Sequence, residues 1–358
     1  MQMSLPVKKV NLMFTACNLS CPMCSVNANA KDVPQILRDY PDAATGPQLT
    51  LDEYKKFFSD IKEFVPQVSI AGGEPSLFYH LPELIKYIKE ECGSSVGVTT
   101  NGTNRSDRMV EGIARYADGV TVSLDGMRET HDSIRGEGNF DKAISFMRSV
   151  LKYKIAGSNI RLYSLLALQI VNHTEVADVV EYLFDEVGID SMTISSLVFS
   201  TDSIIAEHSK WISDRSLDDR YQIAFPRGGV SGVDELYQMD YDLIWNDKEK
   251  VTAKYKHVRY EPDFQSLEDM KTYFLTNKHM PEYFDSKCNP SVNQLVLLSN
   301  GDILFLPGCF QMKMGNIREQ SVRDIWNSNA YNNVRSVLAD DLSPICSHCC
   351  GNRKEKNF

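Results

Sequence analysis

The chain has 358 residues, of which 42% are hydrophobic and 24% charged, as expected for one large globular domain with a smaller one. Its formal net charge of −10 argues against a general binder of nucleic acid or anionic membranes, because both partners require a basic surface. No stretch approaches the ~18 consecutive apolar residues of a membrane span, and no secretory signal opens the chain, so we expect a cytoplasmic protein.

From residue 7 to about residue 200 the sequence alternates strand patterns with helix patterns. Short apolar runs predict strands, and apolar residues at helical spacing predict amphipathic helices. The predicted strands are 7–14, 67–71, 95–100, 119–124, 160–171 and 191–197, and the predicted helices are 51–64, 81–91, 106–117, 140–153 and 174–188. Such β/α repeats build a parallel sheet whose functional residues gather at the carboxyl ends of the strands. We therefore predict an α/β fold, with a partial (β/α)6 barrel over residues 1–200.

The rest of the chain divides into two further segments. Residues 201–287 break the alternation, contain helical pieces near 240–250 and 266–276, and are interpreted as an insert that caps the site. Residues 288–358 form a small α+β domain, in which the sequence "VNQLVLLSNGDILFLPGC" predicts a β-hairpin that turns at Asn300-Gly301. A single helix is predicted over residues 321–338.

Three of the nine cysteines stand together directly after the first predicted strand. Cys17, Cys21 and Cys24 form a C-x3-C-x2-C pattern with no fourth cysteine nearby. Three thiolates suit a [4Fe–4S] cube with one open iron, whereas zinc usually takes four protein ligands in a structural site. A zinc site completed from elsewhere in the chain is the alternative.

Glycine-rich and polar motifs follow the next three predicted strands. In "AGGEP" (71–75) two glycines let the backbone approach a ligand closely, and Glu74 offers an acceptor for a cationic amine. "TTNG" (99–102) and "SLDG" (123–126) place polar groups at the following strand ends. Both also fit ordinary turns, because Asn-Gly and Asp-Gly are turn formers.

Together these motifs resemble those of the radical S-adenosylmethionine (SAM) enzymes, and the resemblance covers nearly the whole chain. In that family a three-cysteine [4Fe–4S] cluster binds SAM at its open iron and cleaves it reductively to a 5′-deoxyadenosyl radical, which abstracts a substrate hydrogen. The resemblance implies that Cys17, Cys21 and Cys24 are the cluster ligands. It implies SAM contacts by Gly72, Gly73, Glu74, Asn101, Ser123, Asp125, Arg135, Gln169 and Met23.

The implied contacts differ in kind. Gly72, Gly73 and Glu74 are similar to the motif that receives the methionyl amine, and Asn101, Ser123 and Asp125 to groups that reach the ribose or carboxylate. Arg135 would pair with the SAM carboxylate or form an ordinary salt bridge. Gln169 would contact ribose or adenine, or fill the barrel. Met23 stands where the family often has an aromatic residue against adenine, and its thioether can fill the same space.

The C-terminal cysteines resemble those of the twitch domain, the short form of the SPASM extension in some radical SAM enzymes. The resemblance implies a second, auxiliary [4Fe–4S] cluster held by Cys288, Cys309, Cys346 and Cys349. Cys350 is an alternative to Cys349, and His348 is expected to be exposed rather than a ligand. A structural zinc site built from the same thiolates is the alternative.

A fully ligated auxiliary cluster would accept the electron that remains after hydrogen abstraction, which implies a dehydrogenation-type redox modification. Since the barrel begins by about residue 7, we expect no N-terminal peptide-recognition module and favour a small-molecule substrate. The alternatives are a peptide maturase that forms a thioether, a C–C bond or an epimer, and a non-catalytic zinc or iron–sulfur protein. We expect a flavodoxin- or ferredoxin-type electron donor. Dehydrogenation also requires a base, which the sequence does not single out.

Overall fold

The computed structural model describes residues 6–24, 46–196, 199, 201–217, 221, 233–276, 278–285, 287–305 and 312–349. Its centre is a single ten-stranded sheet in the order β10-β9-β8-β1-β2-β3-β4-β5-β6-β7. The strands are β1 Lys9–Phe14, β2 Gln67–Gly72, β3 Val96–Thr100, β4 Gly119–Ser123, β5 Arg161–Leu168, β6 Ser191–Ser196, β7 Val258–Glu261, β8 Gln294–Leu298, β9 Asp302–Phe305 and β10 Met312–Asn316. The pairs from β8 through β1 to β7 are parallel, and β8-β9 and β9-β10 are antiparallel.

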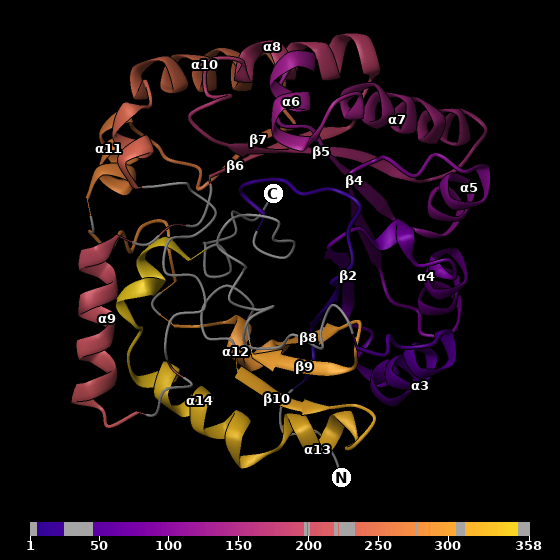
Figure 1. Ribbon diagram of the computed structural model, residues 1–358, viewed down its shortest axis with the longest axis vertical. Helices are drawn as coiled ribbons and strands as arrows, with labels where there is room; N and C mark the ends of the chain where they lie inside the picture. The colour runs from indigo at the N-terminus through magenta and orange to yellow at the C-terminus, as the bar shows by residue number, and fades with distance from the viewer. Residues whose placement is uncertain are drawn as a thin grey trace.

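Helices surround the curved sheet on its outer side (Figure 1). They are α3 Leu51–Ile61, α4 Leu81–Glu90, α5 Asp107–Tyr116, α6 Arg128–Arg135, α7 Asn139–Ile155, α8 Val176–Glu181, α9 Asp202–Asp214, α10 Tyr241–Lys254, α11 Leu267–Leu275, α12 Pro290–Asn293, α13 Val322–Trp326 and α14 Asn329–Asp340. The start of α3 illustrates how the sequence sets a helix end. Thr50 Oγ1 accepts a hydrogen bond from Glu53 N, and the Glu53 carboxylate accepts one from Thr50 N, which together form a capping box. None of the helices in the described ranges is long and apolar enough to cross a membrane.

The two faces of the sheet differ, and the difference shows which side chains point into the barrel. Along β1, every second residue is buried on the helix side, where the Phe14 ring lies 6.1 Å from that of Tyr54 on α3. Met13 points to the opposite face and packs against a separate cluster of Val296, Leu298 and Leu304. Since strand side chains alternate, the residues in register with Met13 line the interior of the barrel.

The architecture confirms the predicted α/β class with a parallel sheet, and the six strands predicted before residue 200 are present. The predicted hairpin is also present, as β8 and β9 around Asn300-Gly301. One helix prediction was wrong: residues 321–338 form two helices, because Ser328 caps the start of α14 by accepting a hydrogen bond from Tyr331 N at 3.2 Å. The division of the chain at residues 200 and 287 stays a prediction.

Strands from outside the first segment extend the barrel sheet at both ends. β7 comes from the segment 201–287 and pairs with β6, and β8 comes from the C-terminal segment and pairs in parallel with β1. Sequence reasoning predicted neither pairing. Both bring residues from the second half of the chain to the same rim as the motifs of the first half.

Candidate functional site

The three-cysteine loop follows β1 at the carboxyl ends of the parallel strands. Cys21 is buried, and Cys17 and Cys24 are half-buried. The pKa of the Cys21 thiol is raised to about 11, mainly by burial. The Arg135 guanidinium opposes this rise, whereas the nearby Cys24 and Cys17 add to it, so the three thiols are neighbours. In the part of the chain that the structure describes, no three His, Cys, Asp or Glu side chains already converge as a complete metal site. Three neighbouring thiols on one loop are nevertheless the donor set of a cluster with an open iron.

The glycines of "AGGEP" let the end of β2 lie directly against the cysteine loop. Gly73 N donates to Phe14 O at 2.5 Å, and Glu74 N donates to Ala16 O at 2.8 Å. A Cβ on Gly72, which has φ +105°, would lie 2.2 Å from Phe14 O, and one on Gly73 would lie 2.1 Å from Ala16 O. The backbone that the glycines approach is therefore that of residues 14–16, just before Cys17.

Glu74 is buried and joins the ends of β2 and β3. Its Oε1 accepts hydrogen bonds from Ser76 N at 3.0 Å and Thr100 Oγ1 at 2.7 Å, and its Oε2 accepts one from Asn101 N at 2.7 Å. A carboxylate oxygen can accept two hydrogen bonds, so Oε2 retains capacity for an amine donor.

Asn101 connects β3 to the cysteine loop. Its Oδ1 accepts from Thr103 N and Thr103 Oγ1, and its Nδ2 donates to Asn18 Oδ1 at 3.0 Å and lies 4.0 Å from Cys17 Sγ. Its side chain thus bonds to the protein on both sides. A contact between Asn101 and SAM stays a prediction.

Asp125 and Arg135 form a buried ion pair beside Cys21. Asp125 Oδ2 accepts from Arg135 Nε at 2.6 Å, and Oδ1 accepts from Ala167 N at 2.8 Å. Burial lowers the pKa of Arg135, but attraction to Asp125 and Cys21 outweighs it, so the pKa is raised and Arg135 stays a cation. The salt bridge expected for Arg135 is therefore present, next to the cysteine loop.

Three more of the residues singled out from the sequence lie around this pair. Ser123 is buried at the end of β4. Met23 is buried and packs with Cys21 and Ile134 in a small apolar cluster. Gln169, after β5, is half-buried and donates from Nε2 to Ala167 O at 3.3 Å. All three stand at the same rim as the cysteine loop.

Two further residues, which the sequence did not indicate, hold Asp125 in place by hydrogen bonds. His131 Nδ1 accepts a hydrogen bond from Asp125 N at 3.1 Å, and burial together with Arg135 lowers the pKa of His131 to about 4, so the ring is neutral. Asn172 Nδ2 donates to Asp125 O and Ala167 O, both at 2.9 Å. Both residues lie on helices or turns that only the fold brings to Asp125.

A second group of cysteines lies in the C-terminal segment. Burial raises the pKa of Cys346 well above its ordinary value, and the nearby Cys349 and Cys288 raise it further, so these three thiols lie in one region of the fold, although among the described residues they do not converge as a metal site. Cys309 and Cys350 lie outside the described residues. The expected exposure of His348 is wrong: the ring is buried, its centroid lies 4.1 Å from that of Phe199, and its Nε2 bonds to Tyr273 O at 3.0 Å.

Glu261 is a further residue at the rim that the sequence did not single out. Within the strands that the structure describes, the only carboxylates are Glu261 and Asp302, and Asp302 is buried and bonded to Asn300, Asn316 and Lys313. Glu261 is exposed and ends β7.

The register of the sheet shows where the Glu261 side chain points. Its neighbour Tyr260 faces the helix layer, where Lys248 Nζ of α10 lies 6.0 Å from the ring centroid, so Glu261 points to the barrel interior. It is paired with Ser195, which is paired with Ala167, the residue that donates to Asp125. At ~4.8 Å per strand, the Glu261 backbone lies roughly 10 Å from that of Ala167.

Two segments of the chain match known protein families. A family profile described as the Radical SAM superfamily matches residues 11–183, and one described as SPASM, an iron-sulfur cluster-binding domain, matches residues 288–350. The chain is 28% identical over 179 residues to sporulation killing factor maturation protein SkfB of Bacillus subtilis (strain 168), with 49% of this chain and 39% of that protein covered. It therefore spans well under half the length of that relative.

Two further proteins match over most of the chain. One is the AdoMet-dependent heme synthase of Methanosarcina barkeri (strain Fusaro / DSM 804), 25% identical over 352 residues, which cover 93% of this chain and 85% of the relative. The other is the crystal structure of Streptococcus suis SuiB, with a TM-score of 0.60 at 17% identity, covering 98% of this chain and 73% of SuiB. Residues 11–183 of the chain therefore belong to the Radical SAM superfamily, whose domain implies a [4Fe–4S] cluster and SAM, and residues 288–350 belong to the iron–sulfur cluster-binding SPASM family.

Proposed function

We propose that the protein is an oxidoreductase that removes two hydrogen atoms from a small molecule, with the auxiliary cluster as electron acceptor. The observation that carries this proposal is the pair of cysteine groups, one directly after β1 and the other formed by Cys288, Cys346 and Cys349. The first group has three thiolates for a cluster with an open iron, and the second has Cys309 as its fourth predicted ligand, with Cys350 as the alternative to Cys349. SAM, when bound at an open iron, supplies the radical that abstracts hydrogen.

The residues around the first group hold SAM in this proposal. Glu74 Oε2, which accepts one hydrogen bond from Asn101 N, receives the methionyl amine. Arg135 donates to Asp125 through Nε, and its terminal nitrogens reach the SAM carboxylate beside Cys21. Gly72 and Gly73 act indirectly, because they let β2 fix the backbone ahead of Cys17.

Glu261 takes the role of the base that a dehydrogenation requires. It is exposed on the inner face of β7, whereas Glu74 and Asp125 are buried. Its carboxylate accepts the hydroxyl or amine proton of the substrate.

The choice of a small molecule as the substrate rests on how much of each relative's length the chain matches. Two curated relatives that match over most of both chains are named a heme synthase and a cofactor-modifying protein, whereas the maturation protein SkfB matches over less than half of each. SkfB's name favours the second candidate, a peptide maturase, for the same site.

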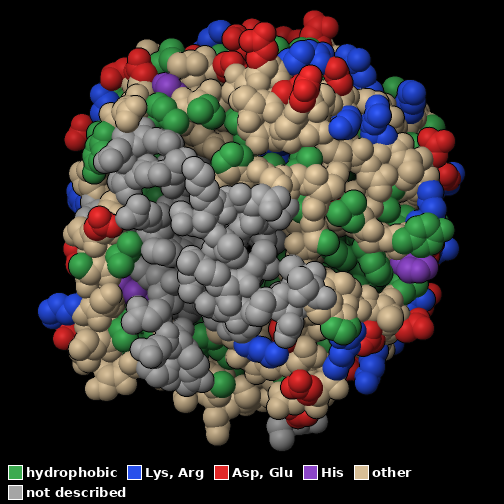
Figure 2. All heavy atoms as spheres, in the orientation of Figure 1, with side chains coloured by type: hydrophobic (Ala, Val, Ile, Leu, Met, Phe, Trp, Pro, Cys, Tyr) green, Lys and Arg blue, Asp and Glu red, His purple; other side chains and the backbone are tan. Residues whose placement is uncertain are grey.

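On the face shown in Figure 2, basic and acidic side chains alternate around the periphery, which favours neither nucleic acid nor an anionic membrane as partner. We further propose a cytoplasmic location and a flavodoxin- or ferredoxin-type electron donor.

The test is anaerobic incubation of the iron-reconstituted protein with SAM, a reductant, and either the small-molecule or the peptide fraction of a cell extract. We expect 5′-deoxyadenosine to form and the small-molecule fraction to stimulate it, with a product that has lost two hydrogen atoms by mass spectrometry. Stimulation by the peptide fraction alone would establish the maturase instead. A protein that binds iron but forms no 5′-deoxyadenosine with either fraction contradicts the proposal and favours a non-catalytic electron carrier.

A further inference from the structure

Ser299 lies where the C-terminal segment meets the start of the three-cysteine loop. β8, the strand that attaches this segment to the barrel, pairs in parallel with β1 from Lys9↔Gln294 to Met13↔Leu298. Ser299 is the next residue after β8, and Thr15 is the first residue after β1. The two strands run in the same direction, so these residues lie side by side at the rim.

Three contacts join the two chain segments at this point. Ser299 Oγ accepts a hydrogen bond from Thr15 N at 3.3 Å and lies 3.0 Å from Thr15 Oγ1, and Ser299 N donates to Met13 O at 3.0 Å. Both side chains are almost completely buried, with 2% of Ser299 and 3% of Thr15 exposed. Hydrogen bonds at such depth hold their geometry, because the alternative is an unsatisfied buried polar group.

The opposite side of the same backbone is held by β2. Gly73 N donates to Phe14 O, and Glu74 N donates to Ala16 O. Residues 14–16 are therefore fixed from both sides immediately before Cys17. One side belongs to the radical SAM match and the other to the SPASM match.

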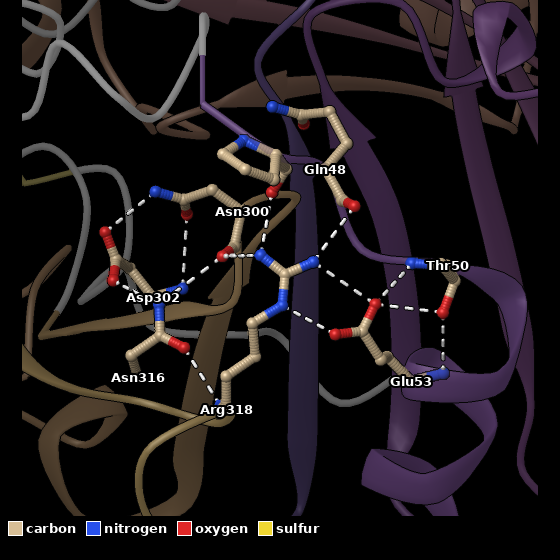
Figure 3. Close-up of polar contacts among 8 residues, drawn as sticks. Gln48, Thr50, Glu53, Asn300, Asp302, Asn316 and Arg318 are labelled. Carbon is tan, nitrogen blue, oxygen red and sulfur yellow. Dashed lines mark hydrogen bonds and ion pairs between the residues drawn. The ribbon is translucent and has the colours of Figure 1, made fainter.

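Ser299 is itself held in place. Its carbonyl oxygen accepts from Leu49 N at 2.6 Å. Figure 3 shows Arg318 between the turn that follows Ser299 and the start of α3: Arg318 Nε donates to Glu53 Oε1 at 2.5 Å, and Arg318 Nη2 donates to Gln48 O at 3.0 Å. Asn300 and Asp302 bond to each other and to Asn316 within the hairpin. The hairpin end is thus a rigid support for Thr15.

We propose that Ser299 is a positioning residue for the three-cysteine loop, so that the SPASM segment helps to set how SAM is bound and cleaved at the other cluster. The proposal rests on the proposed function in one respect, namely that Cys17, Cys21 and Cys24 hold the SAM-binding cluster. It gives the SPASM segment a second task besides holding the auxiliary cluster.

The experiment compares four variants of the full-length, iron-reconstituted enzyme. Ser299→Ala removes the acceptor, and Thr15→Val removes the Thr15 hydroxyl at nearly constant volume. Thr15→Ser keeps the hydroxyl and serves as the conservative rescue. Ser94→Ala is the matched control, since Ser94 is equally buried but its hydroxyl has no hydrogen-bond partner among the described residues.

The probe is SAM alone, with chemical reductant and no substrate, so the unknown substrate is not needed. The measurements are iron per chain, the melting temperature, the rate of 5′-deoxyadenosine formation, and the change that SAM produces in the electron paramagnetic resonance spectrum of the reduced protein. That change isolates the cluster with an open iron, because a fully ligated auxiliary cluster has no site for SAM.

We expect Ser299→Ala and Thr15→Val to bind full iron but to lose roughly tenfold in cleavage rate, with an altered SAM-induced spectrum. Thr15→Ser should recover most of the rate, and Ser94→Ala should match the wild type. A lower melting temperature with unchanged rate and spectrum in both variants overturns the proposal, because Ser299 is then only structural. A wild-type protein without SAM-dependent cleavage contradicts the proposed function itself, irrespective of the variants.

Discussion

Gly73→Ala tests the close approach of β2 to the cysteine loop. The new Cβ would lie 2.1 Å from Ala16 O, whereas ordinary contacts begin at 3.4 Å, so the two backbones must separate by about 1 Å or more. Ala16 directly precedes Cys17, and a displacement of ~1 Å at a catalytic group costs on the order of 10²-fold in rate. Overpacking of this kind also costs ~1–3 kcal/mol of unfolding free energy.

Gly97→Ala is the matched control, because a Cβ on this glycine of β3 would meet no atom within 4 Å. A replacement in open space, at a backbone conformation that alanine tolerates, stabilises a protein by ~0.4–1 kcal/mol through the unfolded chain. Iron content, melting temperature and 5′-deoxyadenosine formation are measured for both variants. The reasoning is refuted if Gly73→Ala cleaves SAM at the wild-type rate with an unchanged melting temperature.

The remaining predictions concern an ion pair, the proposed base and the second cysteine group. Hydrogen bonds from Arg318 hold the pKa of Glu53 at about 2, below its ordinary 4.5, so the pair contributes above pH 4.5 and is lost as the pH falls toward 2. Because Glu53 is about one-third exposed, Glu53→Gln should lower the unfolding free energy of the iron-free chain by only ~1–2 kcal/mol at neutral pH, and a urea-unfolding difference that is undiminished at about pH 2, where the ion pair is largely lost, contradicts this origin. Glu261→Gln should abolish product formation from the identified substrate while SAM cleavage continues, with Glu249→Gln on the exposed face of α10 as control; an active Glu261→Gln variant contradicts the assignment. Cys346→Ala should remove about four irons per chain and leave the SAM-induced spectral change intact, and an unchanged iron content contradicts the auxiliary site.

The sequence was most informative where a local pattern determines local structure. Apolar periodicity predicted the first six strands, and the cysteine spacing after the first of them predicted the loop that the fold places at the rim. The motifs around Glu74, Asn101 and Asp125 reached the same rim because the strands are parallel. Their positions followed from the order of strands along the chain.

The pairing of strands that lie far apart in the sequence could not be predicted from local patterns. Nothing local in residues 294–298 indicates that β8 pairs with β1, so the contact between Ser299 and Thr15 could not be predicted. The same holds for Glu261, whose strand is only four residues long and is stabilised by pairing with β6. His348 was misjudged because its exposure was expected from its place between Cys346 and Cys349, whereas Phe199 and the Tyr273 carbonyl supply a buried environment for a neutral ring.

The most direct test of the central claim replaces Cys17, Cys21 and Cys24 together by alanine. If they hold the SAM-binding cluster, the variant should retain about half of the wild-type iron, on the auxiliary site, and form no 5′-deoxyadenosine under reduction with SAM. A variant that still cleaves SAM at a rate comparable to the wild type contradicts the assignment of this loop.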